Sequence, residues 1–208
     1  MHIILMADIV KSSGRNAKTL MKGFSDVVNA VNKKNRKEIL SPLTITLGDE
    51  FQGVVSNVQS ALKVIFDLEE LSMVAAAPFQ LRYVVVEGDI QTGINKTKAH
   101  AMLGPGLTEA RELLLNLKTT RSRFQVKVRN ESQTEDLNLM FVVMQGIEDQ
   151  WTPARKKVAS AFLKFGDYRT VAEKLKKDPS VIWKRRKSLM ITEFNAIQKL
   201  MMKTAATT

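Results

Sequence analysis

Two aspartates follow short apolar runs, a position from which carboxylates can take part in phosphate chemistry. Asp8 comes after the run at residues 3–6, and Asp49 lies at the tip of a predicted hairpin. If the two strands are neighbours, both carboxylates lie at one edge of a sheet, where such a pair can bind one or two Mg²⁺ ions. Ser12 and Ser13 would add hydroxyl groups suited to the oxygens of a nucleotide phosphate. The alternative is that Asp8 caps a helix and Asp49 only forms a turn.

Basic residues gather in the last part of the sequence and point to a polyanionic partner. The net charge is +11, and residues 150–208 hold 14 Lys and Arg against 4 Asp and Glu, or +10. The predicted DNA-binding residues are Ser180, Trp183, Lys184, Arg185, Arg186 and Lys187. On one helix they would contact the phosphates and base edges of DNA. The alternatives are a basic helical bundle that binds protein, and a Trp183 that belongs to the core, as Trp side chains more often do.

The segments that must position the aspartates alternate between strand and helix patterns. Strands are predicted at residues 3–6, 43–47, 51–55 and 81–86, with amphipathic helices at residues 20–31 and 58–66. The order βαββαβ predicts an α+β fold with a ferredoxin-like palm domain, whose helices lie on one face of the sheet. Beyond it we expect a helix after the loop at residues 104–106, a strand at residues 124–128 and another from Leu139 to Met144.

The basic residues are expected on a small all-α domain. Its helices are predicted from residue 153, at residues 168–175, from residue 179 and at residues 192–203. The spacing of Ala172, Leu175 and Ile182 matches the packing core of a helix-turn-helix, in which a small Ala lets two helices approach closely. The last helix carries an apolar stripe, which is either core or the contact of a homodimer. The sequence therefore predicts a helix-turn-helix domain.

Length and composition bound the class of protein. The 208 residues suffice for a medium and a small domain, which we predict at residues 1–146 and 150–208. Because there is no cysteine, a disulfide framework and a thiolate zinc site are excluded, which suits a reducing compartment. The apolar residues 2–10 are too few to span a membrane and lack the flanks of a signal peptide. We expect a cytoplasmic protein with no membrane partner.

Three segments resemble the SatD family. They are residues 7–13 (ADIVKSS), residues 45–53 (ITLGDEFQG), and Gly104-Pro105-Gly106 followed by Ala110-Arg111. More widely, the first part of the chain is similar to class III nucleotidyl cyclase and GGDEF-type palm domains. That resemblance implies that Asp8 and Asp49 are metal ligands, with Mg²⁺ as the cofactor, and that Arg111 reaches a nucleotide phosphate.

The chain also departs from the cyclase pattern. The lysine that reads the purine in cyclases is Ile45 here, and the later asparagine and arginine fall on Thr108 and Glu112. Losing that arginine removes much of the electrostatic stabilisation of the transition state. The sequence therefore favours a DNA-binding regulatory protein with a degenerate cyclase-like palm that senses a nucleotide or metal. The alternative is a Mg²⁺-dependent nucleotidyltransferase or cyclase-like enzyme acting on a nucleoside triphosphate.

Overall fold

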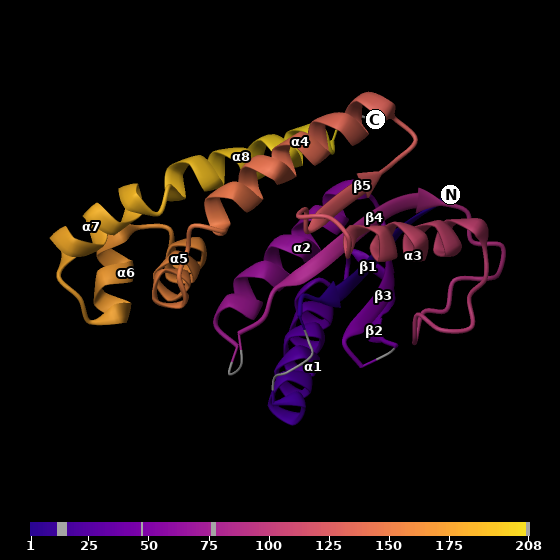
Figure 1. Ribbon diagram of the computed structural model, residues 1–208, viewed down its shortest axis with the longest axis horizontal. Coiled ribbons are helices and arrows are strands. Elements are labelled where there is room, and N and C mark those ends of the chain that lie inside the picture. The colour runs from indigo at the N-terminus through magenta and orange to yellow at the C-terminus, as the bar shows by residue number, and fades with distance from the viewer. Residues whose placement is uncertain (12–15, 47, 76–77, 207–208) are drawn as a thin grey trace.

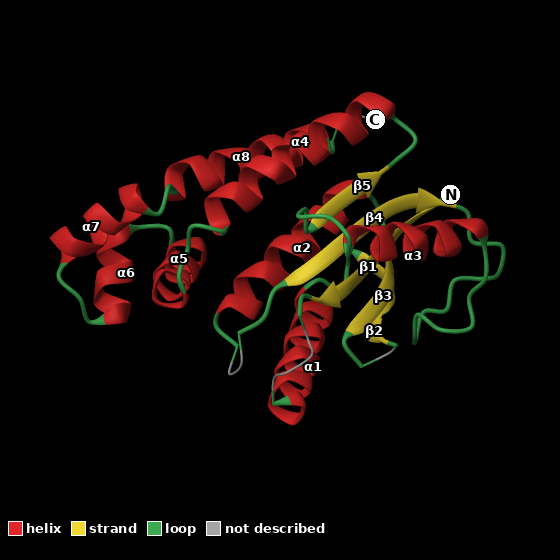
Figure 2. Ribbon diagram, viewed as in Figure 1, coloured by secondary structure: helices red, strands yellow, loops and turns green. Residues whose placement is uncertain are grey.

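The computed structural model describes residues 1–11, 16–46, 48–75 and 78–206, in a mixed α+β fold (Figure 1, Figure 2). The strands are β1 (His2–Ile9), β2 (Ile39–Ile45), β3 (Glu50–Val55), β4 (Leu81–Gly88) and β5 (Phe124–Lys127). The helices are α1 (Ala17–Lys34), α2 (Val58–Met73), α3 (Pro105–Leu117), α4 (Glu131–Glu148), α5 (Pro153–Phe165), α6 (Tyr168–Leu175), α7 (Pro179–Ser188) and α8 (Ile191–Thr204). In the described part of the chain, no helix is long and apolar enough to cross a membrane.

The five strands form one sheet in the order β2-β3-β1-β4-β5. The central strand β1 is antiparallel to both β3 and β4, whereas β5 runs parallel to β4. The expected succession of strands and helices is present up to β4, with α1 between β1 and β2 and α2 between β3 and β4. This arrangement brings the end of β1 beside the beginning of β3, so that residues far apart in sequence share one end of the sheet.

Helices cover both faces of the sheet: α1 and α2 lie on one face, as the βαββαβ order predicts, and the later helix α3 covers the other. Leu5 of β1 belongs to the apolar cluster that includes Phe24 of α1 and Leu62 of α2. The next residue along the strand, Met6, belongs to a second cluster with Leu114 of α3. Because successive side chains of a strand point to opposite faces, an apolar run such as that of β1 is buried on both sides.

Helix α3 approaches β4 at a pair of glycines. A Cβ atom on Gly106 would lie 2.6 Å from the Gly88 Cα atom, closer than side chains pack. Pro105 opens the helix at a position where its missing N–H costs nothing. The loop at residues 104–106 therefore allows the beginning of α3 to lie directly on the sheet.

The segment from Leu139 to Met144 is part of α4, so the predicted strand is wrong. The helix begins after Asn130, whose side chain accepts a hydrogen bond from the Gln133 backbone N–H. Its buried residues are Leu137, Met140, Phe141, Met144, Ile147 and Glu148. Their spacing of three and four residues is that of a helix, and the β-branched Val142 and Val143 lie on its exposed side.

The C-terminal helices share an apolar cluster with the sheet. Phe162 of α5 and Phe194 of α8 are fully buried in the same cluster as Leu5 of β1. Trp151, in the connection between α4 and α5, donates its indole N–H to the Leu189 carbonyl at 3.1 Å. The apolar stripe of α8 is thus core at Phe194 and Met201, whereas Leu200 is exposed.

A buried ionic network joins the sheet to the end of α4. The Arg123 guanidinium contacts Glu69 of α2 at 2.9 Å and Glu148 of α4 at 2.7 Å. Tyr83 donates its hydroxyl to Glu69 at 2.7 Å. Burial raises the pKa of Glu148 to about 8. Burial works to raise the pKa of Glu69, but the Arg123 charge and the hydrogen bonds from Arg123, Glu148 and Tyr83 together outweigh it, so that pKa is lowered. One guanidinium thus serves two carboxyl groups, of which Glu148 holds a proton near neutral pH.

Candidate functional site

The strand register gathers charged side chains at one end of the sheet. Because alternate residues share a face, Asp8 lies on the same face as Met6, under α3. Asp8 pairs directly with Glu50 of β3 on one side and with Arg82 of β4 on the other. The Ile9 backbone N–H donates to the Asp49 carbonyl at 2.9 Å. The structure therefore places Asp8 and Asp49 at the same end of the sheet.

The Asp8 carboxylate is buried and held by two cations. Its exposed fraction is 3%, although it lies at a strand end. One oxygen lies 3.4 Å from the Arg82 guanidinium and the other 3.0 Å from the Lys118 ammonium. Arg82 interrupts the apolar run of β4, and Lys118 caps the end of α3. Sequence reasoning missed both, because their contact with Asp8 follows from the register and from where α3 lies.

Glu50 is a second buried carboxylate, and it pairs with Arg111. The ion pair is 2.9 Å long, and the side chain of Arg111 is 48% exposed. Arg111 thus lies at this end of the sheet, where it neutralises a carboxylate. Sequence reasoning missed Glu50, although it directly follows Asp49. Its place opposite Asp8 follows from the register of β1 on β3, two strands that are separated in sequence by α1 and β2, so it had no local signal.

In this arrangement the carboxylates do not present an open metal site. Two cations occupy the oxygens of Asp8, and a metal ion would have to displace them. Among the described residues, no group of three or more His, Cys, Asp or Glu side chains could hold a metal. The predicted phosphate ligands Ser12 and Ser13 lie outside the described residues. A Mg²⁺ site therefore stays a prediction, and it requires Lys118 and Arg82 to move.

The cations at this end of the sheet can instead attract an anion. Arg111 and Lys118 are seven residues apart, two helical turns along the same side of α3. Both are half-exposed, at 48% and 43% of the side chain. Their outer N–H groups therefore face solvent while their inner contacts hold Glu50 and Asp8. A phosphate that approached α3 would meet two positive charges.

A second candidate surface lies on α6 and α7. Between these helices Lys176 adopts a left-handed conformation with φ of 51°, at a position that glycine usually takes. Ala172 and Ile182, which the sequence placed in the core between the helices, are buried. Leu175 is half-buried and packs against the same cluster.

The outer side of α7 carries the residues predicted to bind DNA. Those that are exposed are Ser180, Trp183, Lys184, Arg185 and Lys187, whereas Arg186 is half-buried. The exposed fraction of Trp183 is 56%, so the alternative that it belongs to the core is wrong. Ser180 donates its hydroxyl to Asp178 at 2.5 Å and is engaged in capping its own helix. Trp183 and Lys184 are therefore the side chains of α7 best placed to contact a partner.

Of the comparisons with known proteins, the family model extends over both candidate surfaces. A family model described as "SatD family" matches residues 2–203. None of the curated proteins matches the sequence. A solved structure titled "Structure of a bacterial light-regulated adenylyl cyclase" is weakly similar, with a TM-score of 0.41 and 11% sequence identity. That similarity covers 60% of this chain and 73% of the other.

Proposed function

Since the chain belongs to the SatD family over both its sheet and its C-terminal helices, we propose a regulatory protein with two binding surfaces. Helices α5 to α7 bind duplex DNA as a helix-turn-helix domain. The sheet belongs to a degenerate palm domain, whose end at Asp8 holds a nucleotide phosphate.

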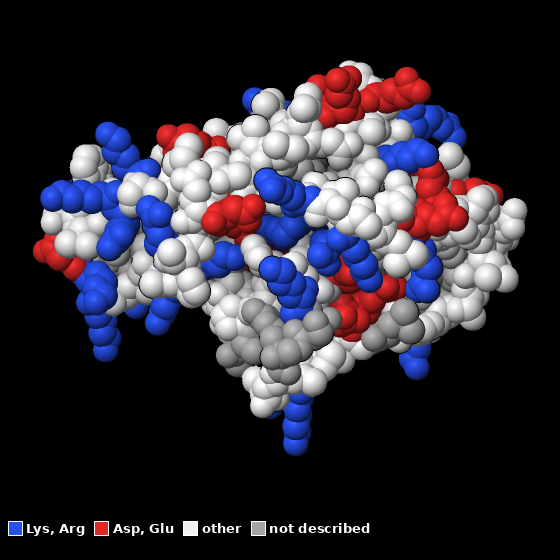
Figure 3. Space-filling view, in the orientation of Figure 1, with Lys and Arg blue, Asp and Glu red and all other residues white. Residues whose placement is uncertain are grey.

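The excess of exposed cations on α5 to α7 carries the DNA proposal. The exposed basic residues there are Lys157, Lys164, Arg169, Lys174, Lys176, Lys177, Lys184, Arg185 and Lys187. The exposed acidic residues are Asp167, Glu173 and Asp178, of which both aspartates cap helices. Lys and Arg side chains project from this part of the molecule on the face seen in Figure 3. Such a surface neutralises phosphates and releases their counterions.

The spacing on α7 supports its role as the helix that contacts bases. Ser180, Trp183, Lys184 and Lys187 recur at intervals of three, one and three residues, which places them on one side of the helix. The cations of α6 and of the turn before α7 flank that side and can contact the DNA backbone. Backbone contacts fix the orientation of a protein on DNA, whereas contacts with base edges select the sequence.

The DNA proposal is tested by fluorescence anisotropy with a labelled duplex over a range of salt concentrations. We expect affinity to fall steeply with salt, and Lys184→Ala or Arg185→Ala to reduce the slope of log affinity against log salt by about 1 each. Lys33→Ala, which removes an exposed cation from α1, is the matched control and should change neither quantity. Binding that is absent, or that is insensitive to salt, would exclude this role.

The pair of half-exposed cations on α3 supports the nucleotide proposal. We expect calorimetric titration of ATP or GTP, each with Mg²⁺, to show saturable binding, and Lys118→Ala to weaken it about tenfold because one charge-assisted contact is lost. Lys127→Ala is the matched control. It also removes an exposed lysine of an ion pair, on β5, and should leave the nucleotide affinity unchanged.

Measuring pyrophosphate release under the conditions of this titration separates a palm that senses a nucleotide from one that catalyses its turnover. A nucleotidyltransferase or cyclase-like enzyme would release pyrophosphate from the bound triphosphate, and Asp8→Asn would abolish the release. Binding without turnover supports a sensing palm. If neither nucleotide binds, the sheet end is structural and this half of the proposal is wrong.

A further inference from the structure

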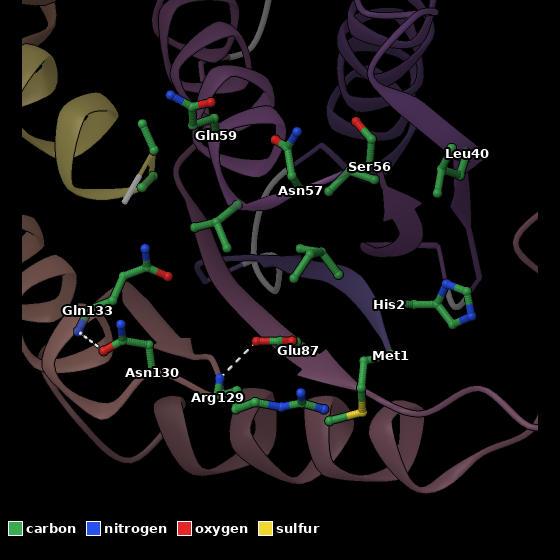
Figure 4. Close-up of a pocket in the computed structure, with 15 residues that line it drawn as sticks. Met1, His2, Leu40, Ser56, Asn57, Gln59, Glu87, Arg129, Asn130 and Gln133 are labelled. Carbon is green, nitrogen blue, oxygen red and sulfur yellow. Dashed lines mark hydrogen bonds between the residues drawn. The ribbon is translucent and has the colours of Figure 1, made fainter. Parts of the chain in front are cut away.

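A cavity of about 660 Å³ opens at the end of the sheet opposite Asp8 (Figure 4). Its walls come from the beginning of β1, the ends of β3 and β4, the beginnings of α2 and α4, and residues 205–206 after α8. Its volume lies within the range of small-molecule sites, about 300–1,000 Å³. The cavity is therefore separate from the charged cluster under α3.

Three side chains that line this cavity, Asn57, Asn130 and Arg129, keep hydrogen-bond donors available. The side-chain oxygens of Asn57 and Asn130 accept the Ser60 and Gln133 backbone N–H groups, which leaves each Asn its amide N–H₂. Within the described chain the Arg129 guanidinium makes no hydrogen bond or ion pair, and Figure 4 shows it along the cavity. A cavity with spare donors and a spare positive charge suits a ligand rich in acceptors.

One carboxylate limits where an anion can lie. Glu87 lines the cavity and accepts the Arg129 backbone N–H at 2.8 Å. An anionic group would be repelled beside Glu87 and attracted at the Arg129 guanidinium, whose five N–H groups fit a carboxylate or phosphate. The charged part of a ligand is therefore placed by Arg129.

Apolar side chains form the rest of the wall. Leu40 is 42% exposed, and it lines the cavity together with Val55, Val58 and Ala206. Val55 and Val58 are buried, so the apolar body of a ligand would cover mainly Leu40 and Ala206, at about 25 cal/mol per Å² of surface removed from water. Free inorganic phosphate would use only the donors and leave this surface wet.

The cavity also adjoins the anchor of α8. Gln59 of α2 donates its side-chain amide to the Met202 carbonyl at 3.0 Å, and Gln133 of α4 donates to the Thr204 carbonyl at 2.9 Å. Both glutamines line the cavity. A ligand there would contact the sheet and the segment that follows the last turn of α8 at once.

We infer that this cavity binds a small organic anion, with its charged group on the Arg129 guanidinium and its apolar body against Leu40 and Ala206. The site goes beyond the proposed function, because it lies at the other end of the sheet and involves none of the residues that would bind DNA or a nucleotide. Occupation of the cavity stabilises the docking of α8 on the sheet.

The inference is tested with two fluorescent probes of one shape, anilinonaphthalene sulfonate and the uncharged phenyl naphthylamine. We expect both to bind saturably to the full chain. Arg129→Ala should weaken the sulfonate about tenfold and leave the neutral probe unchanged, since only the sulfonate uses the guanidinium. Leu40→Ala should weaken both probes about threefold or more, because it removes apolar contact from each.

Arg121→Ala is the matched control. Arg121 is also exposed but does not line the cavity, and its loss should change neither probe. Equal effects of Arg121→Ala and Arg129→Ala, or binding that does not saturate, would overturn the inference. Circular dichroism establishes that each variant is folded. Duplex DNA binding by Arg129→Ala without probe should match wild type, so a failure of the DNA proposal is seen separately.

Discussion

Asp8 and Glu148 are both buried carboxyl groups, but their surroundings differ. Asp8 has a cation at each oxygen, Arg82 on one side and Lys118 on the other. Glu148 shares the guanidinium of Arg123 with Glu69, and its other oxygen lies 3.9 Å from the Lys156 ammonium. A buried charge is tolerated when it is closely paired, but burial and the neighbouring Glu69 charge outweigh these two cations at Glu148. Glu148 therefore keeps its proton near neutral pH.

The proton on Glu148 makes stability depend on pH. Its folded pKa of about 8 lies above the value of about 4.3 expected in the unfolded chain. The stabilising contribution is therefore fully present below about pH 4 and is lost as pH rises through about 8. We expect the free energy of unfolding of wild type, measured with urea, to be lower at pH 8 than at pH 5. Glu148→Gln should remove most of this difference and stabilise the protein at pH 8 by about 1 kcal/mol or more.

Glu69→Gln is the matched control for that experiment. The pKa of Glu69 is lowered, so Glu69 is charged across this pH range and compensates Arg123. Its substitution should destabilise the protein at both pH values, because a buried guanidinium then loses its ionised partner. A wild type with the same urea midpoint at pH 5 and pH 8 would contradict the assignment of the proton to Glu148.

At the scale of elements, α3 determines the charged cluster, since it supplies both Arg111 and Lys118. Its position depends on the contact between Gly106 and Gly88, where an added methyl group would meet backbone atoms. Gly106→Ala should therefore move α3 and lower the free energy of unfolding by about 1–3 kcal/mol. Chemical denaturation measures the loss, and nucleotide affinity should fall with it.

A second glycine in a helix provides the control. Gly146 lies in α4 with no atom within 4 Å of its would-be Cβ. Gly146→Ala should therefore stabilise the protein by about 0.5–1 kcal/mol, because alanine is the better helix former. If both substitutions had the same small effect, the close approach of α3 to β4 would not hold.

The elements with local signals were the ones that sequence predicted well. The strand expected at residues 51–55 matches β3, and Asp178 with Pro179 marked the beginning of α7 at the observed residue. The strand expected at residues 43–47 was only partly right, because β2 lies at Ile39–Ile45. The strand expected from Leu139 failed because its β-branched residues outweighed the helical spacing of the buried ones. Sequence reasoning missed α3 as a layer on the second face of the sheet. The signal for it was that the apolar runs are unbroken, whereas a strand covered on one face only would alternate apolar and polar residues.

The candidate site was predictable only in part. Asp8 and Asp49 lie at one end of the sheet, but not because the first two strands are neighbours, since β3 lies between β1 and β2. Arg82 and Lys118 had no local signal, because their contact with Asp8 depends on cross-strand register and on the position of α3. Trp183 was ambiguous for a different reason. Periodicity alone does not say which side of a short basic helix faces the core.

At the scale of the whole molecule, the two charged surfaces are joined by a packed connection. The chain leaves α4 at Glu148 and enters α5 at Pro153. Glu148 and Trp151, both in this stretch, are buried, at 1% and 4% exposed. The predicted domains at residues 1–146 and 150–208 stay a prediction, but a connection buried in this way does not act as a loose linker.

The contrast between the two tryptophans gives the chain two optical reporters. Trp151 is enclosed, with its indole N–H on the Leu189 carbonyl and its ring 4.9 Å from that of Phe194. Trp183 stands in solvent on α7. We expect the emission of Trp151 to be blue-shifted and shielded from iodide, and that of Trp183 to be red-shifted and quenched by iodide. One unlabelled sample therefore reports the docking of the C-terminal helices through Trp151 and the covering of α7 through Trp183.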